Sequence, residues 1–274
     1  MIVDIDSEKS VLSIVRDLTA DWFSVDDLYI EIKASGKTES SGFWNITSTM
    51  LDTIANYLHM VPDNFREQWN RQCSANALKI MGYHCTRHRN QDVFLHRGIL
   101  PLSDEVISAF FSEIAALLQS SSLNTTALVE LTKNVSKDNM WKYRSGKEAG
   151  PYFFISYKDA KNQDNDFHKS GPEIWWLCTD HLLGYCHENN IDIACSDRFA
   201  LRDIISGVLL PFIIHCEIPY SMIPFKDDCA FYMLRAFFTF IDSEDDLEEF
   251  CSGKSIDLKG QPLEPKYINR IEKL

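Results

Sequence analysis

The sequence Gly150-Pro-Tyr-Phe-Phe-Ile-Ser-Tyr157 predicts a buried strand from residue 152 to residue 157, because β-branched and aromatic residues fill it and Gly-Pro precedes it. The polar residues 159–170 that follow are expected to form a loop. Glu173 then stands before an apolar run in the segment Gly171-Pro-Glu-Ile-Trp-Trp176. A carboxylate at this position must cap a helix or face a cleft, because burying it without a partner is costly.

The size and composition of the chain fit a folded protein with a substantial core. It has 274 residues, of which 45% are hydrophobic and 12% aromatic, and its formal net charge is −13. This acidity argues against broad binding of a nucleic-acid backbone, which needs clustered lysines and arginines. It leaves room for a small local basic groove and also suits a basic protein partner.

The cysteines and the N-terminus indicate the compartment. The eight cysteines include no C-x-x-C pair and most lie among apolar residues, which is typical of reduced thiols in the cytosol. The first residues show no signal peptide, and no apolar run approaches the roughly 18 residues that span a bilayer. We therefore expect a cytoplasmic protein that does not interact with membranes.

Residues 1–90 are predicted to form a mainly helical N-terminal section. Apolar residues recur at helical spacing over 7–23, where Ser7 is placed to cap the helix, and again over 43–60 and 64–81.

Residues 91–274 are predicted to form an α+β body with a small central β-sheet flanked by helices. The pattern predicts strands at 93–99, 152–157 and 209–218, helices at 103–119, from 124 or 125, and 173–189, and a loop at 141–147. Residues 227–239 fit a helix or a strand, and residues 258–271 fit a turn, an extended piece and a last helical turn.

The common catalytic and nucleotide motifs are missing. No P-loop, no Rossmann glycine fingerprint and no G-x-S-x-G elbow is present, which disfavours P-loop enzymes, Rossmann dehydrogenases and ordinary α/β-hydrolases. His215 and Cys216 leave open a hydrolase of another type, although neighbouring residues of a strand point to opposite faces. No second pair of ligands accompanies His84-Cys85-x-x-His88, so no metal site is predicted.

A set of residues in the body resembles the ADP-ribosyltransferase fold. His96-Arg97-Gly98 ends the predicted strand 93–99, the aromatic strand at 152–157 follows, and Glu173 stands alone after a polar loop. The resemblance covers roughly residues 92–219 and concerns the order and spacing of short motifs. It implies an enzyme that uses NAD as a substrate, in the manner of toxins and nucleic-acid-modifying enzymes.

The resemblance also implies roles for individual residues. Glu173 would be the catalytic carboxylate on the ribose 2′-hydroxyl, and Ser156 or Tyr157 the second-strand residue. The cofactor-binding set would comprise His96, Arg97, Gly98, Arg144, Tyr152 and Phe154, with Arg97 or Arg144 on the pyrophosphate and the aromatic residues against the nicotinamide.

The resemblance extends to partners. Gly171 stands where protein-modifying members often carry Gln or Glu, which tilts the expected acceptor toward RNA or DNA. An enzyme of this kind must be restrained in the cell, so an antitoxin or other protein partner is expected.

Two other interpretations stay open. The predicted site residues fit a structural role as well, with Arg97 paired to Asp92 or Asp104 and Glu173 stabilised at a helix N-terminus. The net charge and the acidic run 242–249 also fit a non-catalytic interaction protein, of the antitoxin or immunity type, that sequesters a basic partner.

Overall fold

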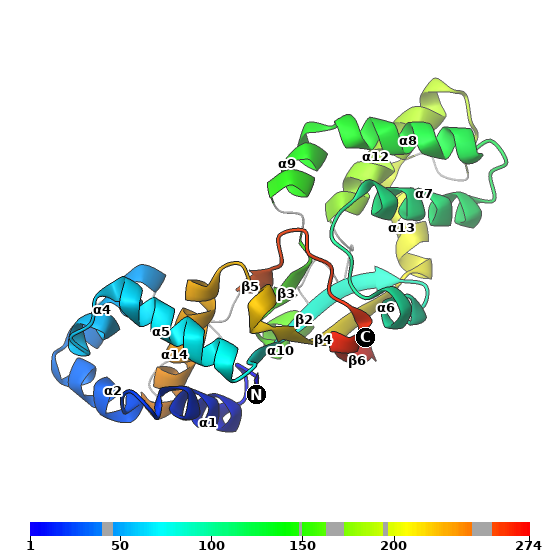
Figure 1. Ribbon diagram of the computed structural model, residues 1–274. Helices are drawn as coiled ribbons and strands as arrows, with labels where there is room; N and C mark the ends of the chain where they lie inside the picture. Colours follow the sequence, from blue (N-terminus) through cyan, green and yellow to red (C-terminus); the bar gives the residue numbers. More distant parts are fainter. Residues whose placement is uncertain (40–45, 148–149, 163–172, 194–196, 243–253) are drawn as a thin grey trace. The chain divides into compact units, whose positions relative to one another are not determined.

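The computed structural model describes residues 1–39, 46–147, 150–162, 173–193, 197–242 and 254–274, and the structural statements below concern these residues. They form a mixed α+β structure that is mainly helical, with one small sheet (Figure 1). The chain divides into two compact units. Unit 1 comprises residues 1–82, 154–159 and 216–256, and unit 2 comprises 83–153, 160–215 and 257–274.

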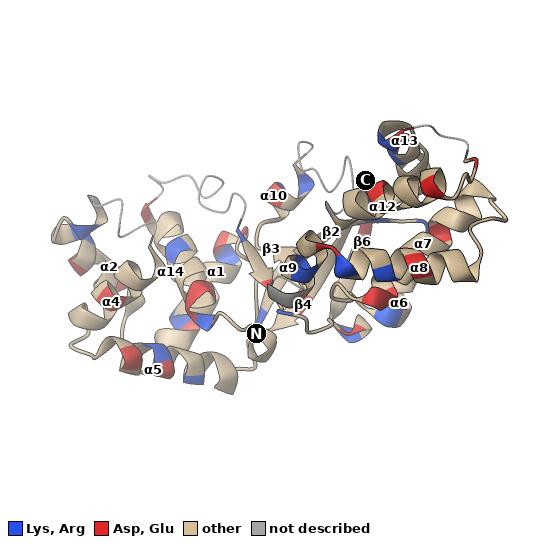
Figure 2. Ribbon diagram, turned by 90° about the horizontal axis from the view of Figure 1, so that it is seen from above, with Lys and Arg blue, Asp and Glu red and all other residues tan. Residues whose placement is uncertain are grey.

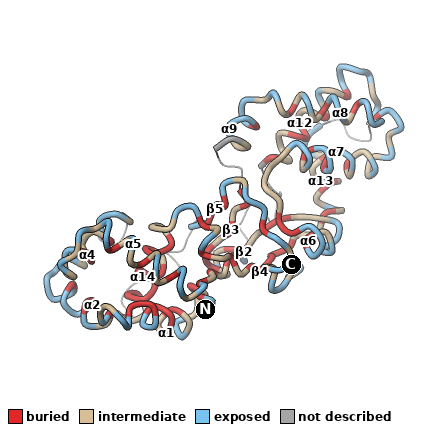
Figure 3. The backbone as a smooth tube through the Cα atoms, in the orientation of Figure 1, coloured by how far each residue is buried: buried red, intermediate tan, exposed pale blue. Residues whose placement is uncertain are grey.

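Unit 1 is built around one buried helix. Its elements are β1 (Ile2–Val3), α1 (Glu8–Thr19), α2 (Val25–Ala34), η1 (Lys37–Glu39), α4 (Thr47–Tyr57), α5 (Pro62–Ala75), η2 (Tyr220–Met222) and α14 (Lys226–Asp242). The side chains of α14 are buried almost without interruption from Cys229 to Thr239, and α1 and α4 pack against it (Figure 3). The Ser7 hydroxyl accepts a hydrogen bond from the amide of Ser10, which fixes the start of α1.

Unit 2 contains a separate helical core. Its helices are α6 (Asp92–Arg97), α7 (Asp104–Leu118), α8 (Thr125–Lys137), α9 (Asn139–Lys147), α12 (Glu173–Glu188) and α13 (Arg198–Val208), with η3 (Pro265–Tyr267) near its end. Apolar side chains of α7, α8, α12 and α13 form one buried cluster, which includes Phe111, Leu131 and Leu182. Ser103, Asn124 and Asp197 cap α7, α8 and α13 through their side chains.

The sheet has the strand order β5-β3-β2-β4-β6, and β1 pairs in parallel with β2. The strands are β2 (Lys79–His88), β3 (Tyr152–Phe154), β4 (Leu210–Pro219), β5 (Ser255–Asp257) and β6 (Ile268–Lys273). In the central strand β4, Ile213 and Ile214 are both fully buried although they face opposite sides of the sheet. The strand therefore has apolar residues in succession rather than in alternation.

Figure 2 marks the acidic and basic residues on the ribbon, and counts over the sequence show that the two units differ in net charge. Counted over the sequence, unit 1 has 22 Asp and Glu against 11 Lys and Arg, so its net charge is −11. Unit 2 has 18 acidic and 16 basic residues, so it carries the remaining −2 of the total of −13. The acidity of the chain is thus a property of unit 1.

Many predicted elements are confirmed. The helices at 7–23, 43–60, 103–119, 124 onward and 173–189 correspond to α1, α4, α7, α8 and α12, and the strand at 209–218 corresponds to β4. Residues 227–239 are helical. The α+β class is confirmed, whereas the ADP-ribosyltransferase-like assignment and the division of the chain at residue 90 stay predictions.

Two elements predicted near the motif His96-Arg97-Gly98 or just before it are wrong in type. Residues 93–99 form helix α6 and not a strand, and Gly98 ends it with φ +72°. The helix predicted over 64–81 ends at Ala75, and residues 79–88 form β2. This strand is buried on both faces, with Ile80 and Tyr83 pointing to opposite sides, so it lacks the alternation that marks a half-exposed strand.

Three further boundaries differ from the prediction. The predicted loop 141–147 belongs to helix α9, and the predicted final helical turn is strand β6. The strand predicted over 152–157 ends at Phe154, and Tyr157 begins the short helix α10 (Tyr157–Lys161). The carboxylate of Asp6 accepts the Tyr157 amide at 2.5 Å, and this long-range hydrogen bond, invisible in the local sequence, starts the helix.

Candidate functional site: a polar centre on the sheet

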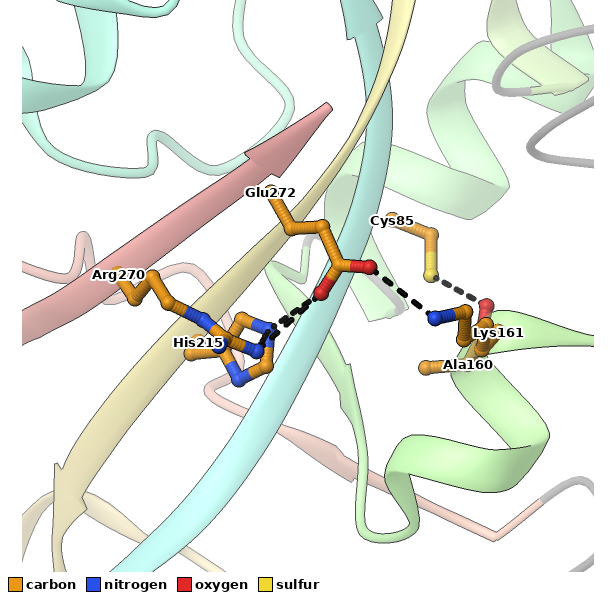
Figure 4. A network of polar contacts seen from close by, with 6 residues as sticks. All are labelled: Cys85, Ala160, Lys161, His215, Arg270 and Glu272. Carbon is orange, nitrogen blue, oxygen red and sulfur yellow. Dashed lines mark hydrogen bonds and ion pairs between the residues drawn. The ribbon is translucent and has the colours of Figure 1, made fainter. Parts of the chain in front are cut away.

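Strands β4 and β6 and helix α10 bring four polar side chains together in unit 2. They are Lys161, His215, Arg270 and Glu272, which we call the polar centre (Figure 4). Arg270 and Glu272 are two residues apart on β6, so the pleat of the strand places both on one face. The last residue of α10 supplies the lysine.

The carboxylate of Glu272 connects the members of the polar centre. Its Oε1 lies 3.3 Å from Nζ of Lys161, and its Oε2 lies 3.2 Å from Nη2 of Arg270. The same Oε2 is 3.4 Å from Nε2 of His215. One carboxylate therefore faces two cations and an imidazole.

Arg270 also contacts the imidazole in this arrangement. Its Nη2 lies 3.0 Å from Nε2 of His215. Because a guanidinium only donates hydrogen bonds, Nε2 can accept this one in the tautomer that carries its proton on Nδ1. Two cations and one carboxylate give the centre a net positive charge in an acidic protein.

The centre is buried at its base and open at its cations. The side chain of His215 is 9% exposed and that of Glu272 is 23% exposed, whereas Arg270 and Lys161 are 58% and 53% exposed. An anionic ligand can therefore reach both cations from solvent. The carboxylate and the imidazole lie directly behind them.

Neighbouring groups hold the centre in place. The ring of Tyr83 on β2 meets the His215 ring edge-on, with centroids 5.1 Å apart. The thiol of Cys85, also on β2, lies 3.4 Å from the carbonyl oxygen of Ala160, which ties α10 to the sheet beside Lys161 (Figure 4).

The pair His215 and Cys216 does not form a nucleophilic site. The two side chains leave β4 on opposite faces, and Cys216 is completely buried. Burial raises the pKa of the Cys216 thiol, so it stays protonated. The same holds for Cys73 and Cys178, whose burial raises the pKa to about 12 in each case.

Residues of the motif His96-Arg97-Gly98 have structural partners. His96 and Arg97 lie in the last turn of α6, and Arg97 pairs with the exposed Glu105 instead of Asp92 or Asp104. At Gly98 a Cβ atom would clash with the carbonyl oxygen of Leu263. The flanking backbone pairs there, since Ile99 and Leu263 exchange two hydrogen bonds of 2.9 Å. Gly98 thus allows a close contact between two chain segments.

The remaining predicted residues lie on several elements. Arg144 is in α9, Tyr152 and Phe154 are half-buried in β3, and Tyr157 opens α10. Glu173 is the first residue of α12, and its side chain lies outside the described part of the structure. The partners found for Arg97, Gly98 and Tyr157 are not members of the predicted set, so the assembly of that set into one site stays a prediction.

The sequence contained only part of the signal for the polar centre. His215 stood out as a histidine in an apolar strand. Arg270 and Glu272 have the i, i+2 spacing of one strand face, but the expected helical turn at this point concealed it. Lys161 looked like an ordinary residue of a polar loop.

Among the described residues, no three His, Cys, Asp or Glu side chains gather as metal ligands. None of the described helices combines the length and the apolar character needed to cross a membrane. Comparison of the chain with protein-family models, curated proteins and solved structures found no match.

Proposed function

We propose that this protein transfers ADP-ribose from NAD and that the polar centre is where the reaction takes place. The observation that carries the proposal is the position of Glu272, a carboxylate held between two half-exposed cations and beside a buried imidazole. Each of these groups matches one requirement of the reaction.

The cations match the pyrophosphate of NAD. Arginine and lysine are the usual partners of phosphate oxygens, and arginine donates from a planar fork. When the pyrophosphate binds Arg270 and Lys161, it replaces Glu272 as their counterion. The carboxylate is then released from its two ion pairs beside the bound ribose.

The carboxylate matches the charge that develops in the transition state. The bond between C1′ of the ribose and the nicotinamide nitrogen breaks, and its electron pair neutralises the pyridinium ring. Positive charge builds on the ribose, and Glu272 stabilises it. A nucleophile of the acceptor then bonds to C1′ and loses a proton, which Nε2 of His215 accepts once Arg270 has turned to the pyrophosphate.

The test measures nicotinamide release from NAD by the purified protein, with RNA, DNA or cellular protein as acceptor. Glu272→Gln removes the charge and keeps the shape, and we expect a loss of at least about a hundred-fold in rate. Glu264→Gln is the matched control, because Glu264 is exposed in the same unit and pairs with a nearby lysine. Its rate should equal that of the wild type.

Nicotinamide release by the Glu173→Gln variant shows which of the two glutamates, Glu173 or Glu272, the reaction requires. If this variant loses release and Glu272→Gln retains it, the reaction belongs to the residues predicted from sequence and the polar centre is not its site. Absence of release with every acceptor would remove the transferase proposal. RNA or DNA is the acceptor we expect.

A second candidate function is supported by the charge of unit 1. With a net charge of −11 it suits a basic protein partner, as an antitoxin or immunity protein would. Such binding must weaken steeply with salt and be unaffected by Glu272→Gln. Retention of a basic partner at about 0.5 M NaCl would contradict it.

A further inference from the structure

A second arginine of unit 2 lies in a small pocket between α12 and α13. Arg202 lines it together with Trp176, Thr179, Ile205 and Ser206, and its guanidinium lies against the Trp176 ring. The pocket belongs to helices that contribute nothing to the polar centre.

Two hydrogen-bond donors of Arg202 are buried without a partner. Its Nε and Nη1 atoms are shielded from solvent, and no acceptor lies within hydrogen-bond distance of either in the described part of the chain. Most buried donors in folded proteins are paired, because an unpaired one costs free energy. Burial lowers the pKa of the Arg202 guanidinium; the charge of Asp180 opposes this shift and the charge of Arg198 adds to it.

Aromatic surface adjoins this guanidinium. Phe199, one turn before Arg202 on α13, is 60% exposed as a residue, and the centroid of its ring lies 5.8 Å from the guanidinium carbon of Arg202. Arg198 lies over the same ring at 5.1 Å. An exposed aromatic ring beside arginines is the arrangement on which nucleic-acid bases stack.

We propose that the pocket is a binding site for a phosphate joined to an aromatic base, as in a nucleoside monophosphate or the phosphorylated end of a single strand. When the side chains that shield Nε and Nη1 of Arg202 move aside, the phosphate oxygens accept hydrogen bonds from both atoms, and the base stacks on Phe199. Trp176 holds the guanidinium in place from its other face. This site does not depend on the transferase proposal.

The first experiment measures binding of AMP, adenosine and inorganic phosphate to the full-length protein by titration calorimetry. We expect AMP to bind more tightly than either of its parts. Arg202→Met should weaken AMP binding at least about ten-fold and leave adenosine unchanged, because it removes only the phosphate donors. Phe199→Ala should weaken both AMP and adenosine by about five-fold or more, since a stacked base contributes roughly 1–3 kcal/mol.

Two control variants locate the site. Lys266→Met removes an exposed cation elsewhere in unit 2, and Arg270→Gln alters the polar centre. AMP affinity should stay at the wild-type value in both. Loss of AMP binding in Arg270→Gln with retention in Arg202→Met would overturn the proposal, as would the absence of AMP binding at millimolar concentration.

The melting temperature of the Arg202→Met variant shows whether a loss of AMP binding could come from misfolding. Methionine fills the space of the arginine stem without buried donors, so the unliganded Arg202→Met variant should melt at or above the wild-type temperature. An oligonucleotide with a 5′-phosphate, compared with its 5′-hydroxyl form and with AMP, then identifies the source of the ligand. If the 5′-phosphorylated oligonucleotide binds more tightly than AMP, the ligand is the end of a strand. If the two bind equally, the ligand is a free nucleotide.

Discussion

Arginines pair with carboxylates in both units, but unit 2 also has arginines with other partners. In unit 1, Arg66 contacts Asp52 at 2.6 Å and Asp227 at 2.9 Å, and Arg16 contacts Asp26 at 2.7 Å. These arginines neutralise part of the excess of carboxylates. In unit 2, Arg87 and Arg202 contact groups that are not carboxylates, and Arg270 contacts a histidine in addition to a carboxylate.

Arg87, Arg202 and Arg270 of unit 2 have distinct surroundings. Arg87 donates to the carbonyl oxygens of Ser206 and Leu209 at the end of α13, Arg202 lies against an indole ring, and Arg270 donates to a histidine as well as to Glu272. Arg202 can bind a ligand oxyanion without breaking an ion pair, and Arg270 can do so by exchanging Glu272 for the ligand. Anion binding is therefore expected in the nearly neutral unit, although the whole protein is acidic.

The cores of the two units should be the most sensitive to substitution. Phe237→Ala in α14 and Phe111→Ala in α7 each remove a fully buried ring, and each should lower the free energy of unfolding by about 3–5 kcal/mol. Urea unfolding measures the loss, and hydrogen exchange shows which helices lose protection. Loss of protection in α7 and α8 on changing Phe237 would contradict the division into two units.

Gly98→Ala tests whether this glycine has a structural role in unit 2. A Cβ atom would meet the Leu263 carbonyl and φ is positive, so we expect a loss of about 2 kcal/mol or more. Gly207→Ala in α13 is the control, since nothing lies within 4 Å of its Cβ position, and it should be neutral or slightly stabilising. Equal stability of the two variants would argue instead for the ligand role predicted from sequence.

Acid should affect unit 2 through His84. Burial lowers the pKa of this imidazole, against the opposing effect of its hydrogen bond to the Tyr152 carbonyl. As pH falls below about 6.5, the unfolded chain takes up a proton that the folded chain resists, so stability decreases. His84→Gln should remove this part of the pH dependence between about pH 6.5 and 5, as measured by urea unfolding. An unchanged slope would show that the imidazole is not responsible.

Unit 1 should respond to acid at lower pH and more weakly. Burial acts to raise the pKa of Asp242, but hydrogen bonds from Lys33 and Tyr29 outweigh it, so the pKa lies below its usual value. The ionised carboxylate therefore stabilises the fold above about pH 4, and this contribution disappears as the pH falls through the lowered pKa. Asp242→Asn should cost up to about 1 kcal/mol at pH 7 and nothing at about pH 2. If Asp242→Asn still lowers the stability at about pH 2, the loss comes from a change of shape and not from the missing charge.

The amino-acid sequence was enough to predict the α+β class and most of the helices. Helical spacing and capping residues act over a few positions, so Ser7, Ser103 and Asn124 marked the starts of α1, α7 and α8 correctly. The net charge, the lack of the common nucleotide motifs, and His215 as an unusual residue in an apolar strand were also evident from it.

Several strands and both candidate sites depend instead on contacts between distant segments. β2 and β6 escaped prediction because pairing partners far along the chain, and not local spacing, determine whether such segments are extended. Lys161 and Glu272 meet across 111 positions of sequence, and Arg202 faces a ring of another helix. Contacts of this kind depend on how the elements pack, which no local pattern of residues specifies.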